Sequence, residues 1–414
     1  MKLKEQEDKL KYLGYTLLVF LSVYGIKIAL KPSDFTVFLT ASEMLLAGDM
    51  PYNEWLFVSE GNYCFYFYSP LWAYVLAPFT FLPSFVAQYL WLLLNVFFLY
   101  RIGQLLLDYI GNYRRIKAVY LFVFILSARF LFYNFEMIQM TLFVVWGGLE
   151  ALAQFRSGKN VRGAFILAFI INVKLLPLVL LPYLFYRGML KAGLLTIGFS
   201  LLFLALPALW LGWSANWELH QEWFAVINPS NAEHLLETDL GPHSLTALIP
   251  TLFTETEGVI DAQRHIANLS VDTAVLIMNF CRLLLILFTL YFVGKPWFLM
   301  KERPSKLNDL RAIAYLFLLI PLIFPHQQKY AFFCIVPTVF YLVYYCFEHW
   351  ANKSLRLKTI LVFMGLSFLL MTLTTDGLVG RSLNAVFQHY KLITYGALML
   401  VPALVLARFS VSED

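Results

Sequence analysis

Apolar runs of about membrane-spanning length follow one another from Tyr12 to Ala407, separated by short polar segments. Because the hydrocarbon core of a bilayer is about 30 Å thick, a helix that crosses it needs roughly 20 apolar residues. The runs are continuous, whereas the strands of a membrane β-barrel alternate between apolar and polar positions. The pattern therefore predicts an all-α polytopic membrane protein.

The runs and their polar boundaries predict about 12 membrane-crossing helices. They are expected at residues 12–30, 86–107, 117–133, 138–155, 161–174, 175–187, 191–212, 271–293, 312–324, 329–347, 358–374 and 390–407. The charged N-terminus precedes the first run, and no small-residue cleavage site follows it. This arrangement is typical of an uncleaved signal anchor.

Loop charges orient the predicted helices, because basic residues mark cytoplasmic loops. The basic clusters are Arg114/Arg115/Lys117, Arg156/Lys159/Arg162, Arg187/Lys191, Lys295 to Arg311 and Lys353/Arg356/Lys358. Placing all of them in the cytoplasm requires an even number of crossings between successive clusters. Tyr68–Pro83 then does not cross, which agrees with its three prolines and its Trp and Tyr content. We interpret it as an interfacial or re-entrant helix.

This topology places the protein in the cell inner (plasma) membrane with both termini on the cytoplasmic side. It makes residues 1–414 a single membrane domain. A first outer loop with interfacial helices covers residues 31–85, and a long outer loop covers residues 213–270. The long loop carries eight acidic residues against Arg264 as its single basic residue. Residue types that serve catalysis therefore gather on the extracytoplasmic face.

Composition changes this interpretation little. The chain is 60% hydrophobic and 14% charged, far from soluble averages. The net charge of +5 reflects the basic residues in the predicted cytoplasmic loops and does not suggest a nucleic-acid partner. Those loops contain no Gly-rich phosphate cradle and no Walker-type lysine, so nucleotide chemistry in the cytoplasm is not supported. The four cysteines are scattered singly, without metal-ligand spacing, and are expected to be packing residues.

Asp34–Asn53, directly after the first apolar run, is the most informative segment. Phe35, Phe38 and Leu45 recur at helical spacing, and Gly48 is a typical stop, so a short amphipathic helix is predicted. Ser33 or Asp34 is suited to cap that helix. A carboxylate at a helix start is also held ionised and oriented, so Asp34 is equally a candidate catalytic base.

Two predicted helices are too short to cross the membrane completely. Arg162 and Lys174 are 12 residues apart, about 18 Å in a helix, and Arg311 and Pro325 are 14 residues apart. Polar or irregular backbone at membrane depth is tolerated only beside a cavity or inside protein. A polar pocket that opens outward is therefore expected at Lys174 and at the segment after Pro325.

The remaining candidate substrate-binding residues each have a plainer alternative. Lys174 either binds substrate or extends its amine to the interface. His326, Gln328, Lys329 and Tyr330 either bind phosphate and sugar hydroxyls or form an ordinary interfacial loop. Four further positions are weaker candidates: Glu136 and Gln139 as helix-start residues, Arg381 as a surface charge, and His243 at the return of the long loop.

The Asp34–Asn53 segment resembles the opening of glycosyltransferase family 87, which shows DF, an aromatic pair, an alanine-rich turn, Gly and PY. YSPLWAYVLAPFTFLP, the Gln139 segment, NVKLLPLVLLPYLFYRG and LIFPHQQKYAFFCIVP fit the family in order, and HSLTALI resembles its Gln-Ser-Leu stretch. The departures are His243 where the family more often has Gln, Tyr330 where it often has His, and Glu136.

The resemblance implies a GT-C fold and transfer of a sugar from a polyprenyl-phosphate donor to a lipid or glycan acceptor on the extracytoplasmic face. The family's chemistry is inverting and includes mannosyl and arabinofuranosyl transfer to envelope glycolipids. Asp34 stands where such enzymes place an essential carboxylate, and no metal or cofactor is required. Departing phosphate would be stabilised by Lys329 with His326, or by Lys174. The alternatives from other classes are a secondary transporter or flippase, expected to show inverted repeats, and a lipid-binding or assembly scaffold.

Overall fold

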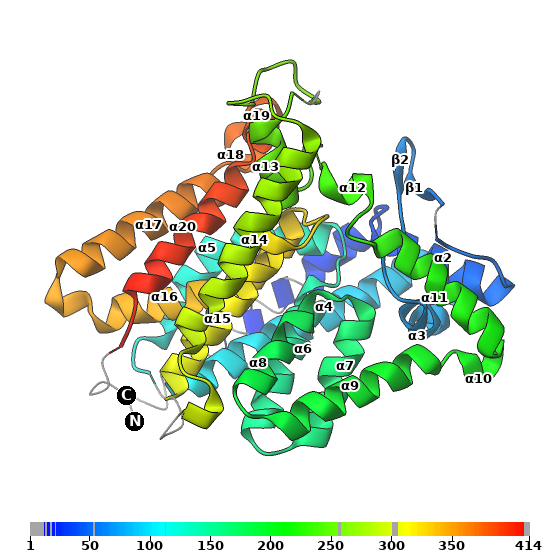
Figure 1. Ribbon diagram of the computed structural model, residues 1–414, viewed down its shortest axis with the longest axis horizontal. Helices are drawn as coiled ribbons and strands as arrows, with labels where there is room; N and C mark the ends of the chain where they lie inside the picture. The colour runs from blue at the N-terminus through cyan, green and yellow to red at the C-terminus, as the bar shows by residue number, and fades with distance from the viewer. Residues whose placement is uncertain are drawn as a thin grey trace. The chain divides into compact units, whose positions relative to one another are not determined.

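The computed structural model describes residues 12–409 except residues 13, 14, 17, 18, 21, 53, 112, 238, 256, 257 and 300–304. The structure is helical, with one two-stranded hairpin among the described residues (Figure 1). The Lys-rich N-terminus, Glu257 and part of the Lys295–Arg311 cluster lie outside the described residues.

The first half of the chain contains the following elements. They are α2 (Phe35–Ala47), β1 (Leu56–Ser59), β2 (Asn62–Cys64), α3 (Pro70–Thr80), α4 (Ser84–Ile110), α5 (Ile116–Glu136), α6 (Thr141–Arg156), α7 (Asn160–Val173), the 3₁₀ helix η1 (Leu176–Val179), α8 (Leu180–Tyr186), α9 (Leu190–Ala205), α10 (Ala208–Leu211) and α11 (Trp213–Ile227).

The second half contains ten helices of four or more residues and two shorter 3₁₀ helices among the described residues. They are α12 (Ala232–Leu235), α13 (Leu245–Phe253), α14 (Val271–Val293), η2 (Trp297–Leu299), α15 (Lys306–Ile323), η3 (Lys329–Ile335), α16 (Val336–Glu348), η4 (Trp350–Asn352), α17 (Leu355–Met371), α18 (Asp376–Val379), α19 (Arg381–His389) and α20 (Leu392–Leu406).

The chain forms two compact units, each built from separate stretches of sequence. Unit 1 comprises the chain up to Leu105 with Tyr133–Leu178 and Leu190–Ile227. Unit 2 comprises Leu106–Phe132, Val179–Met189 and the chain from Asn228 onward.

In unit 1, α7 packs against α6 and α9, and α2 packs against α3 and the β1–β2 hairpin. The hairpin pairs its strands antiparallel, with Phe57 opposite Tyr63. The buried side chains of Leu71, Ala168 and Phe203 join α3, α7 and α9 in one hydrophobic cluster. These contacts fix the helix ends at which the candidate site residues lie.

In unit 2, α17 and α20 run side by side (Figure 1) and make the most extensive helix contact of that unit. Their backbones approach closely at Gly396, where an added Cβ would lie 2.3 Å from Met371 Cγ. Small residues permit such close packing between membrane helices. The predicted long outer loop is itself folded: Leu245, Leu248 and Ile249 of α13 pack on Met278 of α14.

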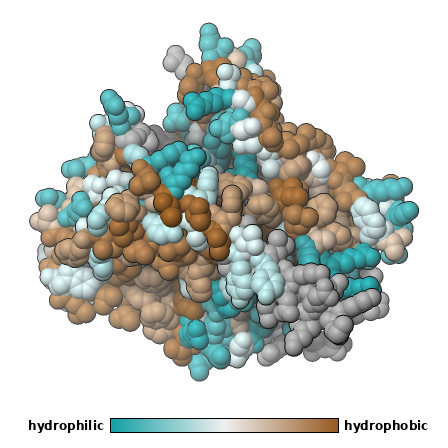
Figure 2. Space-filling view, turned by 180° about the vertical axis from the view of Figure 1, so that it is seen from behind, coloured by the Kyte–Doolittle hydropathy of each residue, from teal (hydrophilic) through white to brown (hydrophobic). Residues whose placement is uncertain are grey.

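By length and composition, five helices in the described part of the chain qualify to cross a membrane, and a sixth does if the bent pair α19 and α20 forms one span. On α14, apolar side chains at helical spacing face outward: Leu276, Phe280, Leu283, Leu287 and Leu290 are each about half exposed or more. Hydrophobic residues cover much of the face in Figure 2. Apolar stripes of this kind fit contact with lipid, so the chain is an all-α multi-pass membrane protein.

From residue 84 onward the predicted helix positions agree closely with the observed ones, whereas part of the helix predicted at residues 12–30 lies outside the described residues and the number of 12 crossings stays a prediction. The short helix α3, with 11 residues, occupies the stretch interpreted as non-crossing. One predicted boundary is wrong: the helix expected from residue 312 begins at Lys306, because Ser305 caps it by accepting from Asn308 N at 3.2 Å.

Candidate functional site

Asp34 lies where the first apolar segment turns into α2. Its backbone is already helical, but its carboxylate makes no capping hydrogen bond. The cap is supplied by Ser33, whose Oγ accepts from Phe35 N at 3.2 Å and whose carbonyl accepts from Thr36 N. Gly48 ends the helix with φ +90°, as predicted. The interpretation of Asp34 as a side-chain cap is therefore wrong, and its carboxylate is available for another role.

Gln139 supplies the contact that Asp34 does make. Its Nε2 donates to Asp34 Oδ2 at 2.6 Å across 105 residues of sequence. No hydrogen bond reaches Oδ1 of Asp34 within the described part of the chain. The expectation that Glu136 and Gln139 begin a helix is wrong, because Glu136 ends α5 and Gln139 lies in the break before α6.

Tyr68 and Lys174 complete the surroundings of this carboxylate. The Tyr68 hydroxyl donates to Gln139 Oε1 at 3.2 Å, and the Lys174 ammonium lies 5.3 Å from the centre of the Tyr68 ring. Lys174 is the residue that follows α7, in the break before η1. Four helix ends therefore meet in unit 1, and together they form what we call the Asp34 site: Asp34, Tyr68, Gln139 and Lys174.

Burial dominates the electrostatics of the Asp34 site. It raises the pKa of the Asp34 carboxyl, while the Gln139 amide and the Lys174 charge oppose that rise. Burial, with the nearby Asp34 charge, also raises the pKa of the Cys64 thiol to about 11 and raises the pKa of Tyr68. Asp34 is thus a stronger base than an exposed aspartate and has neutral neighbours apart from Lys174.

A second polar cluster lies in unit 2 around Glu237. Its Oε1 accepts from His326 N and lies 2.7 Å from His326 Nδ1, and its Oε2 accepts from Ser244 Oγ at 3.3 Å. The His234 ring packs on His326 with centroids 4.3 Å apart. We call Glu237, Ser244, His234 and His326 the Glu237 cluster. Here both carboxylate oxygens are engaged.

His243 lies beside this cluster and is fully buried. Its backbone N–H donates to the carbonyl of Gln327 at 2.8 Å, and its own carbonyl accepts from Thr394 Oγ1. Burial, followed by the charges of Lys391, Lys329 and Arg129, holds the pKa of its ring well below the ordinary value. His243 is therefore a neutral residue that anchors the segment preceding α13.

The other candidate residues do not belong to the Asp34 site. Gln328 precedes η3, which Lys329 and the buried Tyr330 begin. Arg381 is exposed at the first position of α19, and Glu136 is exposed at the end of α5. The structure thus groups Asp34, Gln139 and Lys174 within unit 1 and His243 and His326 within unit 2.

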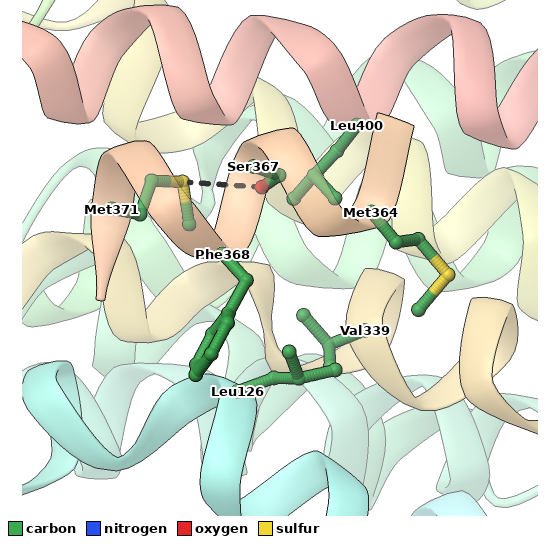
Figure 3. A pocket seen from close by; sticks show the side chains of 7 residues that line it. All are labelled: Leu126, Val339, Met364, Ser367, Phe368, Met371 and Leu400. Carbon is green, nitrogen blue, oxygen red and sulfur yellow. Dashed lines mark hydrogen bonds between the residues drawn. The ribbon is translucent and has the colours of Figure 1, made fainter. Parts of the chain in front are cut away.

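One further feature of unit 2 belongs to neither cluster. A small pocket in unit 2 is lined by Leu126, Val339, Met364, Ser367, Phe368, Met371 and Leu400 (Figure 3). Its hydroxyl, Ser367 Oγ, donates to Met371 Sδ at 3.6 Å (Figure 3), so the pocket presents no reactive group. Within the described ranges, no group of three or more His, Cys, Asp or Glu side chains is placed to hold a metal ion.

Sequence reasoning misses Tyr68 and Glu237 as site residues. The sequence places Tyr68 only in an interfacial aromatic stretch. Tyr68 directly precedes Ser69, which caps α3, and therefore lies at a helix junction. Glu237 is one of eight acidic loop residues, and nothing in its local sequence distinguishes it. Its partner His326 is 89 residues away, so no spacing pattern connects them.

The comparisons with known proteins address the resemblance noted in the sequence. The model of glycosyltransferase family 87 matches residues 66–325, which is more than half of the chain. The matched region contains Gln139, Lys174 and His243, begins after Asp34 and ends before His326. Searches of the curated proteins and of the solved structures gave no match. The chain belongs to glycosyltransferase family 87 and is a multi-pass membrane glycosyltransferase.

Proposed function

We propose that the protein transfers a sugar, mannose or another hexose or pentose, from a polyprenyl-phosphate donor to a lipid or glycan acceptor. The reaction takes place on the extracytoplasmic face of the inner membrane with inversion at the anomeric carbon, and Asp34 is the general base. The observation that carries the proposal is the state of the Asp34 carboxylate: Oδ2 is held by Gln139 and Oδ1 is open.

The chemistry needs a base on the acceptor and a stabiliser for the leaving group. The acceptor hydroxyl donates its proton to Asp34 Oδ1 as its oxygen bonds to the anomeric carbon. The bond from that carbon to the phosphate oxygen breaks, and the electron pair leaves with the prenyl phosphate. An oxocarbenium-like transition state connects the two events.

Asp34 suits this role because its surroundings raise its pKa and leave Oδ1 able to accept a proton. The raised pKa of Asp34 strengthens a base that is otherwise weak. Positioned bases contribute about 10²–10⁴-fold to such reactions. Since the base must be ionised, the rate falls as the pH drops through the pKa of Asp34, and it does so at a higher pH than for an exposed aspartate.

The negative charge that grows on the phosphate requires a cation. The candidates for it are Lys329 with His326, or Lys174; the charge of Lys174 also favours the ionised form of Asp34, because it lowers the pKa of that carboxyl. The remaining candidates Gln328, Tyr330 and Arg381 are proposed to contact substrate hydroxyls, whereas the fully buried His243 is not. No metal and no cofactor enter this scheme.

The test uses the purified full chain in proteoliposomes with a series of radiolabelled polyprenyl-phosphate sugars and extracted lipid acceptors. Wild type is expected to transfer one sugar, with inverted configuration in the product by NMR. Asp34→Asn is expected to lower kcat by about 10²–10⁴-fold. The matched control Asp49→Asn changes an exposed aspartate just after α2 and should transfer at the wild-type rate.

Two outcomes would reject the proposal in different ways. Undiminished transfer by Asp34→Asn would remove Asp34 as the base. Transfer by wild type from nucleotide sugars but from no prenyl-linked sugar would remove the donor class. Movement of a lipid-linked substrate without any transfer would favour the transporter or flippase.

A further inference from the structure

Gln139 is a buried amide with 3% of its surface exposed, and every polar group of its side chain has a defined partner. Nε2 donates to Asp34 Oδ2 at 2.6 Å. Oε1 accepts from the Tyr68 hydroxyl at 3.2 Å and from Met140 N at 3.4 Å. A flipped amide would turn its oxygen toward a carboxylate, which only accepts, and would leave the Met140 N–H without this acceptor. The contacts therefore permit one orientation of the amide.

The backbone of Gln139 is fixed as firmly as its side chain. Its carbonyl accepts from Asn95 Nδ2 at 3.2 Å and from Trp91 Nε1 at 3.4 Å, both on α4. Its N–H donates to Asn134 O, and the N–H of Ile138 donates to Phe135 O. This pair of bonds is a Schellman motif that ends α5.

The left-handed position of that motif, normally glycine, is occupied by Ile138 with φ +50°. A β-branched residue in this conformation is a real backbone outlier. Ile138 is fully buried, so the surrounding packing maintains the strain. Such strain is concentrated at functional sites, where it places a group that relaxed backbone would not place. The residue placed here is Gln139.

A neutral amide is a distinctive partner for a base. A guanidinium in the same position would hold the carboxylate but would weaken it as a base. The Gln139 amide fixes one oxygen and leaves Asp34 without a direct ion pair to this partner. The titratable groups that face Asp34 are Lys174, whose charge favours ionisation, and Cys64 and Tyr68, whose own pKa values Asp34 raises.

We propose that Gln139 is the positioning residue of the transfer reaction: its amide, locked by Tyr68, fixes Oδ2 of Asp34 so that Oδ1 meets the acceptor hydroxyl. Gln139 therefore acts through Asp34 and does not bind substrate as its place in the sequence suggested. This inference rests on the proposed role of Asp34 as base.

The test replaces Gln139 with the isosteric glutamate. At low pH, the introduced carboxyl group and Asp34 share one proton, and the protonated carboxyl donates to Oδ2 as the amide did. At high pH both are ionised, repel each other and lose the geometry. The variant Gln139→Glu is therefore expected to show a falling alkaline limb in kcat that wild type lacks. Once the shared proton is lost, kcat should be about 10²-fold below wild type, with KM nearly unchanged.

The chain offers a matched control. Gln154 of α6 donates to Glu150 Oε1 at the same distance of 2.6 Å, in the same unit. Gln154→Glu makes the identical chemical change next to a carboxylate that is not part of the Asp34 site. It should keep the wild-type pH profile. Tyr68→Phe, which frees the amide to turn, should lower kcat by a smaller factor at all pH values.

The outcomes separate this inference from the proposed function. Loss of transfer in Asp34→Asn together with a wild-type pH profile in Gln139→Glu would overturn the positioning role alone. Full transfer by Asp34→Asn would overturn the base itself. If Gln139→Glu cannot be purified as a folded protein, Tyr68→Phe decides: an unchanged kcat there would overturn the proposal.

Discussion

Each unit contains a carboxylate at the centre of a polar cluster, Asp34 in unit 1 and Glu237 in unit 2, and the bonding of the two differs. Glu237 in unit 2 has both oxygens engaged, by His326 and by Ser244, and its side chain is 2% exposed. Asp34 in unit 1 has one oxygen held by an amide and the other open. Each lies near a non-glycine residue in the left-handed conformation, His326 and Ile138 respectively.

The difference supports the roles that we propose for the two carboxylates. A buried polar group whose bonding capacity is filled stabilises the structure around it. A base must instead keep a lone pair for a substrate hydroxyl and must be held by something other than the substrate. Glu237 meets the first description and Asp34 the second, although both are acidic residues of predicted outer loops.

The largest expected effect is that substitution of Asp34 lowers activity, whereas substitution of Glu237 lowers stability. Asp34→Asn should lower kcat by about 10²–10⁴-fold with little change in the melting temperature. Glu237→Gln should leave kcat near wild type and lower the free energy of unfolding by about 1–3 kcal/mol, because it disrupts buried hydrogen bonds. Transfer assays and thermal unfolding in detergent measure the two quantities. A catalytic defect in Glu237→Gln without loss of stability would contradict the comparison.

The next effect concerns close packing in unit 2. Gly396→Ala places a methyl group 2.3 Å from Met371 Cγ and 3.1 Å from Ser367 O, so it should cost about 1–3 kcal/mol of stability through overpacking. Gly365→Ala in α17 is the control, because no atom lies within 4 Å of its added Cβ. Equal melting temperatures for the two variants would show that α17 and α20 do not pack as described.

A smaller effect is expected from Lys174→Met. The variant removes a positive charge that lowers the pKa of Asp34, so that pKa rises further and the acid limb of kcat/KM moves to higher pH. Activity should fall most at low pH and recover at high pH. Lys191→Met, which removes an exposed charge in the same unit, should leave the profile in place. A uniform loss at all pH values would instead assign Lys174 to the phosphate.

The smallest effect concerns His243 and stability at acid pH. Because its folded pKa lies well below the ordinary value, the unfolded chain binds a proton that the folded chain does not as the pH falls below about 6.5. Its contribution therefore lowers stability in acid and vanishes above that range. His243→Gln should reduce the drop in melting temperature between about pH 7 and about pH 5, and His265→Gln should not.

Local patterns determined much of the secondary structure. The period of Phe35, Phe38 and Leu45 and the stop at Gly48 depend on neighbours a few residues away, so α2 is predictable from sequence. The proline-rich stretch that forms α3 is likewise recognisable as short. The role of Asp34 is not decided locally, because a helix-start carboxylate is as consistent with a cap as with a base.

The sequence by itself determined an apolar, helical, multi-pass chain and, through ordered motifs, its family, since hydrophobic period and turn residues are local properties. Only the tertiary structure decided that Ser33 caps α2, that Gln139 reaches Asp34 across 105 residues, and that Glu237 is saturated while Asp34 is not. Those facts depend on which helix ends meet after packing. Hydrogen bonds between distant residues leave no periodic trace in the sequence, so the open oxygen of Asp34 is a property of the fold.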